Sequence, residues 1–167
     1  MPNHCTNRVS FYSDDTTVIL RLHKIFSRAL DENDTRTVFG AFIPEPDWAN
    51  TPLAKNDVLE YSWDKPKGEA GELPVLKDKG FGEGLYFAST DRQDDRWYNW
   101  RNQNWGTKWD AYSMEIDDCE MPNAFQVEFQ TAWAPPEEVC HAIREQFDDL
   151  TVSWFYDEPG CEVAGYL

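Results

Sequence analysis

The chain has 167 residues, a formal net charge of −16 at pH 7 and a hydrophobic content of 41%, including eight tryptophans. This much apolar material excludes an acidic disordered chain and is enough for one folded core. The negative charge disfavours direct binding to nucleic acid or to anionic membrane surfaces, because like charges repel.

Targeting and redox signals are also missing from the sequence. No apolar run approaches the roughly 20 residues of a membrane-spanning helix, and the first five residues do not resemble a signal peptide. We therefore expect a cytoplasmic protein. Four cysteines stand alone rather than in Cys-x-x-Cys pairs, so we expect neither a zinc site nor a disulfide framework.

The N-terminal part predicts a strand, a helix and a second strand. Residues 8–12 alternate in polarity, and the polar triplet at 13–15 is typical of a helix cap. Apolar residues then recur at helical spacing over 16–30. A short apolar segment at 37–43, stopped by Pro44, predicts the next strand.

The middle of the chain predicts an irregular insertion at about 48–84. Its Pro, Gly, Lys and Glu residues have no apolar period, and at most brief strands are expected at 58–63 and 75–76. The glycine run at 80–84 is interpreted as a loop. An extended segment at 85–88 precedes a short helix that contains Trp97 and is capped by Thr90 or Asp91.

The C-terminal part predicts the order β-β-α-β-β. Its expected strands are residues 111–116, 125–131, 151–156 and 162–166. The helix begins after Pro135-Pro136, which suit a first helical turn. We therefore predict a single α+β domain over 1–167, a ferredoxin-like sandwich with an antiparallel sheet and helices on one face.

Several short stretches resemble the YubB ferredoxin-like family. They are Met1-Pro2-Asn3 with Cys5 and Asn7, the segment Asn104 to Ala111, Thr131-Ala132-Trp133 with Pro135-Pro136, and a closing set of Tyr156, Glu158, Gly160, Ala164 and Gly165. Proteins of this family are encoded largely on phages and plasmids. The resemblance implies the fold and a mobile-element origin, and it implies no activity.

The negative charge is concentrated near the C-terminus. Residues 1–108 hold 17 acids and 14 bases, whereas residues 109–167 hold 14 acids and one base, Arg144. We interpret this as a directed acidic surface that imitates nucleic-acid phosphates and inhibits a host defence protein of the anti-CRISPR or anti-restriction type. The expected contact residues are Asp117, Asp118, Glu120, Glu137, Glu138, Glu145, Asp148 and Asp149, with Trp105 and Trp109 as aromatic anchors.

The expected partner is a basic nucleic-acid-binding host protein, such as a CRISPR effector or a restriction nuclease. The segment from Trp105 to Asp110 also has a structural interpretation, in which the tryptophans pack over the sheet end and Asp110 or Thr107 satisfies buried backbone donors. A second hypothesis is a small-molecule or protein-binding accessory domain whose acidity is incidental.

Enzymatic function ranks last. The sequence has no Gly-x-Ser-x-Gly, Walker-type or dinucleotide-binding pattern in a suitable context. No set of residues supplies a nucleophile, a base and oxyanion donors. We therefore expect no catalytic residue, no cofactor and no metal ion.

Overall fold

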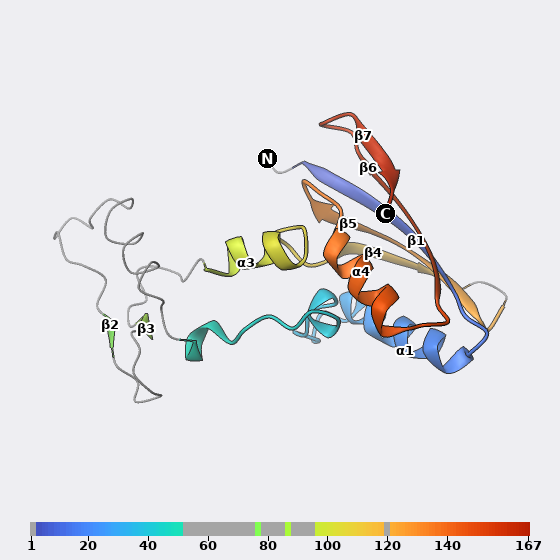
Figure 1. Ribbon diagram of the computed structural model, residues 1–167, viewed down its shortest axis with the longest axis horizontal. Coiled ribbons are helices and arrows are strands. Elements are labelled where there is room, and N and C mark those ends of the chain that lie inside the picture. Colours follow the sequence, from blue (N-terminus) through green and yellow to red (C-terminus); the bar gives the residue numbers. More distant parts are fainter. Residues whose placement is uncertain (1–2, 52–75, 78–85, 88–95, 119–120) are drawn as a thin grey trace. The chain divides into compact units, whose positions relative to one another are not determined.

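The computed structural model describes residues 3–51, 76–77, 86–87, 96–118 and 121–167 (Figure 1). The chain divides into two compact units, one of Met1–Pro44 with Tyr98–Leu167 and the other of Glu45–Trp97. The predicted brief strand at 58–63, the glycine loop at 80–84 and the predicted caps Thr90 and Asp91 lie outside the described residues.

The first unit is built on a five-stranded antiparallel sheet with the order β4-β5-β1-β6-β7. The strands are β1 (His4–Tyr12), β4 (Tyr112–Asp117), β5 (Ala124–Ala132), β6 (Thr151–Glu158) and β7 (Val163–Tyr166). Two helices, α1 (Thr16–Phe26) and α4 (Glu137–Gln146), cover one face of this sheet (Figure 1). The predicted α+β ferredoxin-like fold is confirmed, with β7 as an additional edge strand.

Helix α1 forms where the sequence predicts it, because Asp15 caps its N-terminus. The Asp15 carboxylate accepts hydrogen bonds from the backbone N–H of Thr17 at 2.8 Å and from its hydroxyl at 2.7 Å. Ile19, Leu22, Ile25 and Phe26 are its buried residues. The last four residues of the predicted helix, Ser27–Leu30, continue as a 3-10 helix.

Helix α4 follows Pro135-Pro136, as predicted. Glu137 and Glu138 occupy its first turn, where carboxylates interact favourably with the positive end of the helix dipole. Val139, Cys140 and Ile143 form its buried face. These residues recur at helical spacing, so one side of α4 packs on the sheet and the other side is exposed.

The predicted strand at 37–43 is wrong. This segment contains a 3-10 helix, Phe39–Ala41, in which the N–H of Phe42 and that of Ile43 both donate to the carbonyl oxygen of Phe39. Val38, Phe39 and Phe42 are buried. The segment therefore contributes apolar side chains to the core without joining the sheet.

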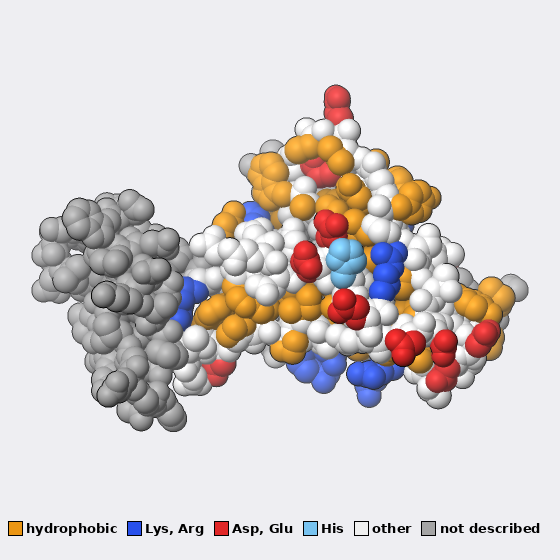
Figure 2. Space-filling model, viewed as in Figure 1, with side chains coloured by type: hydrophobic (Ala, Val, Ile, Leu, Met, Phe, Trp, Pro, Cys, Tyr) orange, Lys and Arg blue, Asp and Glu red, His pale blue; other side chains and the backbone are white. Residues whose placement is uncertain are grey.

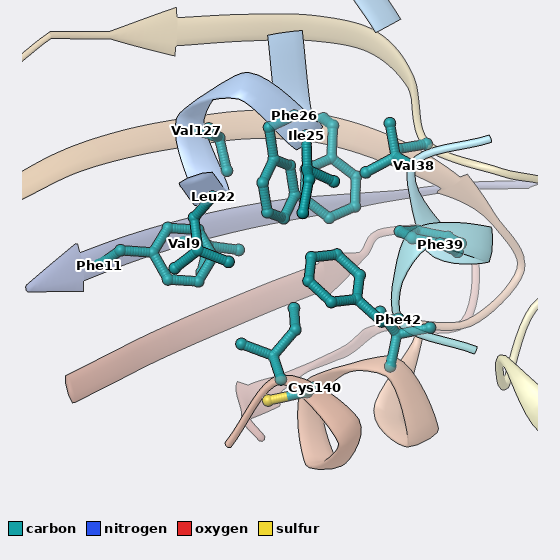
Figure 3. Packing of buried hydrophobic residues seen from close by; sticks show 14 of the residues in the cluster. Val9, Phe11, Leu22, Ile25, Phe26, Val38, Phe39, Phe42, Val127 and Cys140 are labelled. Atoms are coloured by element: carbon teal, nitrogen blue, oxygen red, sulfur yellow. The ribbon is translucent and has the colours of Figure 1, made fainter. Parts of the chain in front are cut away.

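The core lies between the sheet and the two helices (Figure 3). In β1, alternate residues from Cys5 to Phe11 are buried, and the residues between them lie on the open face of the sheet. The rings of Phe11 and Phe125 stack with centroids 5.0 Å apart. The rings of Phe129 and Trp154 meet edge to face at 5.7 Å, which joins β5 to β6 across the central strand.

The second unit is described only in part. It contains a 3-10 helix at Trp48–Asn50 and a two-stranded ladder of β2 (Leu76–Lys77) with β3 (Tyr86–Phe87). The guanidinium of Arg96 donates to the carbonyl oxygens of Trp48 and Thr51 at 3.0 and 2.9 Å. Helix α3, Arg96–Asn104, begins at this arginine and matches the predicted short helix.

Among the described helices, none combines the length and the apolar character needed to cross a membrane.

Candidate functional site

Three of the predicted contact acids lie on the exposed face of α4. Glu137, Glu138 and Glu145 are exposed, together with His141. Residues 137, 141 and 145 follow one another at intervals of four, so they stack along one side of the helix over about 12 Å. We call Glu137, Glu138, His141 and Glu145 the α4 strip. Figure 2 shows acidic side chains beside a histidine over this helix, with a basic side chain next to them.

The remaining predicted acids are not all brought to the α4 strip. Asp148 and Asp149 are exposed in the turn that follows α4. Asp117 is paired in register with Gln126 of β5, whereas Asp118 bonds to the His23 ring of α1 at 2.8 Å between Oδ1 and Nε2. The Asp118 carboxylate is therefore engaged by His23, and Glu120 lies outside the described residues.

Trp105 is not available to a partner. Its side chain is completely buried, its Nε1–H donates to the carbonyl oxygen of Ile43 at 3.0 Å, and its ring meets that of Phe39 edge to face at 5.7 Å. The guanidinium of Arg101 lies over the same ring at 4.7 Å. Trp105 is thus a core residue, as the structural interpretation of its segment predicted.

Trp109 belongs to a small group of rings at the start of β4. Its ring meets that of Tyr112 at 6.0 Å, and Tyr112 meets the His4 ring at 5.9 Å. The Tyr112 hydroxyl and His4 Nδ1 are 2.6 Å apart. The ammonium of Lys108 lies 4.4 Å above the Trp109 ring. We call Trp109, Tyr112, His4 and Lys108 the ring group.

Asp110 performs the backbone-capping role that the sequence suggested. Its carboxylate accepts the N–H groups of Val38 and Phe39 at 2.7 and 2.9 Å. Burial raises the pKa of this carboxyl group above its ordinary value, and the backbone hydrogen bonds oppose that rise. Asp110 therefore holds the 3-10 turn in place, and its role here is structural.

The stretches that resemble one family converge at one end of the sheet. The N–H of Trp133 donates to the carbonyl oxygen of Asn3 at 3.0 Å, and the Thr107 hydroxyl donates to that of Ala132 at 2.9 Å. Gly106 has a φ of +84°, and a Cβ there would lie 3.1 Å from the carbonyl oxygen of Pro135. Hydrogen bonds and close packing therefore hold segments that are far apart in the sequence together at this end of the sheet.

A buried polar cluster lies at this same end. The Asn7 amide donates to the carbonyl oxygen of Cys5 at 3.1 Å and to the Thr131 hydroxyl at 2.9 Å. Its oxygen accepts the indole N–H of Trp154 at 3.1 Å. Asn7, Thr131 and Trp154 are completely buried, so this network links the three central strands inside the protein.

Glu158 is a buried acid two residues beyond Tyr156, the register partner of Asn7. It ends β6 and is only 2% exposed. Its Oε2 accepts the backbone N–H of Cys161, and its Oε1 has no hydrogen-bond partner among the described residues. The predicted strand at 151–156 ended before Glu158, because the type of a residue does not reveal that an acid is buried.

Exposed basic residues lie outside α4, on α1 and on the open face of the sheet. On α1, Arg21 and Lys24 are exposed, and Figure 2 shows basic side chains along the lower edge of this unit, over α1. On the open face of the sheet, Arg8 bonds to Glu128 and to Asp157 at 2.8 and 3.3 Å. Exposed acids also lie outside α4 and the turn after it, for example Asp14, Glu32 and Glu115.

No metal centre emerges from the part of the chain that the structure describes, since it holds no group of three or more His, Cys, Asp or Glu side chains suited to a metal ion.

Residues 108–167 match a family model described as the ferredoxin-like domain in Api92-like protein. The match covers the part of the chain from β4 to β7. The structure is also similar to the crystal structure of protein api92 from Yersinia pseudotuberculosis, with 11% sequence identity, a TM-score of 0.49, and coverage of 99% of this chain and 93% of that one. No curated protein matches the chain.

Proposed function

We propose that this protein is a non-enzymatic binding protein whose acidic α4 strip occupies a basic, nucleic-acid-binding groove on another protein. The observation that carries the proposal is the composition of the exposed face of α4, which holds three carboxylates and a histidine. Arg144, the basic residue of this helix, is half-buried and donates to the carbonyl oxygens of Val152 and Leu167 at 3.3 and 2.9 Å.

The physical basis is that carboxylates replace nucleic-acid phosphates as the anions bound in the basic groove. A groove that binds nucleic acid presents Lys and Arg to phosphates, and carboxylates fixed on a packed helix meet the same side chains. Opposite charges also steer the encounter, which is fastest at low ionic strength. Asp148 and Asp149 extend the α4 strip by one exposed turn.

The partner we propose is a CRISPR effector or a restriction nuclease in the cytoplasm of a host cell. The resemblance to the YubB family supports this choice, because that family is carried by phages and plasmids. A mobile element gains from a protein that blocks a host nuclease. The exposed basic residues of α1 limit the proposed interface to α4 and the turn, since Lys and Arg repel a basic groove.

The test compares two charge-reversal variants with the same change in net charge. The strip variant carries Glu137→Lys, Glu138→Lys and Glu145→Lys. The matched control carries Glu32→Lys, Glu115→Lys and Glu162→Lys, which are exposed positions outside α4 and outside the predicted contact residues. Each protein is titrated into DNA-cleavage assays of a panel of restriction nucleases and CRISPR effectors at 50 and 300 mM salt.

The wild-type protein and the control should inhibit at least one nuclease in competition with DNA, and inhibition should weaken at the higher salt concentration. The strip variant should lose at least about tenfold in potency, because three attractive pairs become repulsive. Equal potency of the strip variant and the control would remove the α4 strip from the interface.

The ring group favours a second candidate function, a domain that binds a small molecule or a neutral protein surface. Trp109 and Tyr112 are half-buried at the start of β4, and the ammonium of Lys108 lies over the Trp109 ring. Aromatic rings with a few polar groups are typical of ligand sites. Thermal melts with nucleotides and metabolites separate the candidates, since a ligand of the ring group raises Tm in wild type and not in Trp109→Ala.

A further inference from the structure

The five-stranded sheet has two edge strands, β4 and β7, and they differ in how they are protected. The register of β4 shifts between Tyr112 and Glu115, and Ser113 within that irregularity has a φ of +50°. This edge also presents the exposed acids Glu115 and Asp117. Irregularities and charges of this kind keep an edge strand from pairing with another chain.

Strand β7 has none of these protections. Its sequence, Val163-Ala164-Gly165-Tyr166, contains no charged residue and no proline, although the chain has a net charge of −16. Its register with β6 is continuous. Two of its side chains are exposed apolar groups, Val163 at 47% and Tyr166 at 73%. A regular, uncharged edge strand of this kind is a template for pairing with a further strand.

The hydrogen bonds of β7 show which of its backbone groups face outward. The N–H of Leu167 donates to the carbonyl oxygen of Trp154 at 3.0 Å, and the register of β6 with β7 places these two residues opposite each other. Opposite residues in an antiparallel ladder alternate between hydrogen-bonded and non-hydrogen-bonded pairs. Gly165 therefore bonds to β6, whereas the N–H and C=O groups of Ala164 and Tyr166 point to the open edge. Within the described residues, no backbone hydrogen bond from a turn or loop reaches these outward groups.

We propose that β7 pairs antiparallel with β7 of a second copy of this chain, with the two Gly165 residues opposite each other at the two-fold axis. In this register Ala164 of each copy lies opposite Tyr166 of the other, and each such pair exchanges two hydrogen bonds between the outward groups. An axis at Ala164 would instead place Tyr166 opposite Glu162, whose φ of +57° is not that of a strand. The register with Gly165 at the axis is thus the one that uses both outward residues inside β7.

The side chains of β7 favour a second copy as the occupant, because they complement themselves in this register. The small Ala164 lies beside the large Tyr166 of the opposite strand, and Gly165 has no side chain to clash at the axis, where the two backbones approach most closely. The rings of Tyr166 and Phe155 meet edge to face at 5.2 Å, which orients Tyr166 on its face of the sheet. The strand itself carries no charge, so the repulsion between two acidic copies acts only over longer distances.

This pairing does not depend on the function proposed for the α4 strip. Opposite side chains of an antiparallel pair share one face of the sheet, so the helices of both copies lie on the same face of one continuous sheet. The two proposals also respond to salt in opposite directions, because groove binding is attractive between charges and dimerisation brings like charges together. At 300 mM salt the strip variant should dimerise like wild type, so failure of one proposal is distinguishable from failure of the other.

The first test is analytical ultracentrifugation of the full chain over a range of concentrations at 50 and 300 mM salt. Wild type should form a dimer whose dissociation constant falls at the higher salt concentration, because screening reduces the repulsion between the copies. Ala164→Pro removes an outward N–H while leaving the β6–β7 ladder intact, and it should weaken the dimer at least about tenfold. Ala164→Val keeps that N–H and should dimerise like wild type. A monomer at every concentration, or equal dimerisation of the two variants, overturns the proposal.

The second test fixes the register and does not depend on a proline variant. Gly165→Cys and Ala164→Cys are made separately in a chain that also carries Cys119→Ser and Cys161→Ser, and each protein is oxidised with glutathione disulfide. Opposite residues of a non-hydrogen-bonded pair are about 4.5 Å apart between Cα atoms, which a disulfide can bridge. Gly165→Cys should therefore give a covalent dimer on a non-reducing gel. Ala164→Cys should not, because its two copies lie diagonally across the axis. Crosslinking of Ala164→Cys alone, or of neither variant, as expected if β7 receives a strand of a different protein, contradicts the pairing.

Discussion

At the scale of single residues, the position of an acid matters more than its number. In a chain this acidic, carboxylates are expected on the surface, yet Asp110 and Glu158 have mainly backbone partners. Asp110 has two N–H donors and organises a turn. Glu158 has one and keeps an oxygen unpaired. Both carboxylates therefore bind backbone N–H groups inside the fold, and neither belongs to the exposed acidic surface.

The role of Asp110 predicts a loss of stability on substitution. Asp110→Ala should lower the free energy of unfolding by about 2–4 kcal/mol, because two buried backbone N–H groups lose their acceptor. Urea unfolding measures the change. Asp117→Ala removes an exposed acid and should stay within about 0.5 kcal/mol of wild type. Equal effects of the two substitutions would contradict the capping role.

The free cysteines should differ in reactivity. Burial raises the pKa of the Cys5 thiol to about 11 and also raises that of Cys140, so both stay protonated at pH 8. Cys161 is exposed, and its pKa is raised mainly by the hydrogen bond with Glu158. Iodoacetamide at pH 8, followed by peptide mass spectrometry, should label Cys161 well before Cys5 and Cys140.

The same experiment on Glu158→Gln should label Cys161 faster than in wild type, since the carboxylate that disfavours the thiolate is removed. Denatured protein, in which all of these thiols react, provides the reference. Rapid labelling of Cys5 in the native protein would show that its end of β1 opens readily.

At the scale of elements, local patterns were sufficient where they agreed with tertiary packing. Pro135-Pro136 and the apolar period after them predicted α4, the hairpin pattern predicted β5, and alternation predicted β6. The first strand was predicted from residue 8, whereas β1 begins at His4, because the buried Asn7 breaks the apolar alternation. Its burial depends on Thr131 and Trp154, which no local pattern reveals.

The segment at 37–43 shows why its strand prediction was wrong. A short apolar run has the same composition in a strand and in a buried turn. What decides between them is Asp110, whose carboxylate binds the N–H groups at the start of the turn from 71 and 72 positions away in the sequence. A hydrogen bond over such a separation is invisible to a local reading.

The candidate site was predictable only in part. Exposure of Glu137, Glu138 and Glu145 followed from the helical period of α4. The position of Asp117 depends on the register of β4 with β5, and that of Asp118 depends on its bond to His23. The burial of Trp105 depends on its contacts with Ile43 and Phe39. Tertiary contacts of this kind have no signature in the sequence.

The turn at Gly106 connects α3 to β4, packs against the backbone at the start of α4, and should tolerate no side chain. Gly106→Ala places a Cβ at a φ of +84° and within 3.1 Å of both Pro135 O and Glu137 N. We expect the free energy of unfolding to fall by about 1–3 kcal/mol. Gly165→Ala adds the same methyl group without a close contact, and thermal melts of the two should differ clearly. Similar melting temperatures would argue against a constrained turn.

At the scale of the whole molecule, the core belongs to the first unit. The residues of its hydrophobic cluster come from positions 9–43 and 100–167. The Trp105 indole bonds to the carbonyl oxygen of Ile43, and Tyr98 lies seven residues before Trp105 along α3 and the turn after it, so Pro44 and Tyr98 are separated by at most roughly 20–25 Å. A linker of about eight residues spans such a distance.

We therefore predict that a chain in which residues 45–97 are replaced by eight Gly and Ser residues keeps the ferredoxin-like fold. It should unfold cooperatively in urea with a midpoint close to that of the full chain, because the described core loses no side chain. Circular dichroism and NMR of the shortened chain provide the check. Loss of cooperative unfolding would show that residues 45–97 are part of the folding unit.

Because β1 lies at the centre of the sheet, both of its neighbouring strands are synthesised long after it. The ribosome delivers β1 first, but its two neighbours, β5 and β6, begin only at Ala124 and Thr151. At cellular rates of synthesis the first strand waits on the order of 10 s for its second neighbour. During that delay its apolar face is open to chaperones and proteases, so expression should respond to chaperone supply more strongly than the size of the protein suggests.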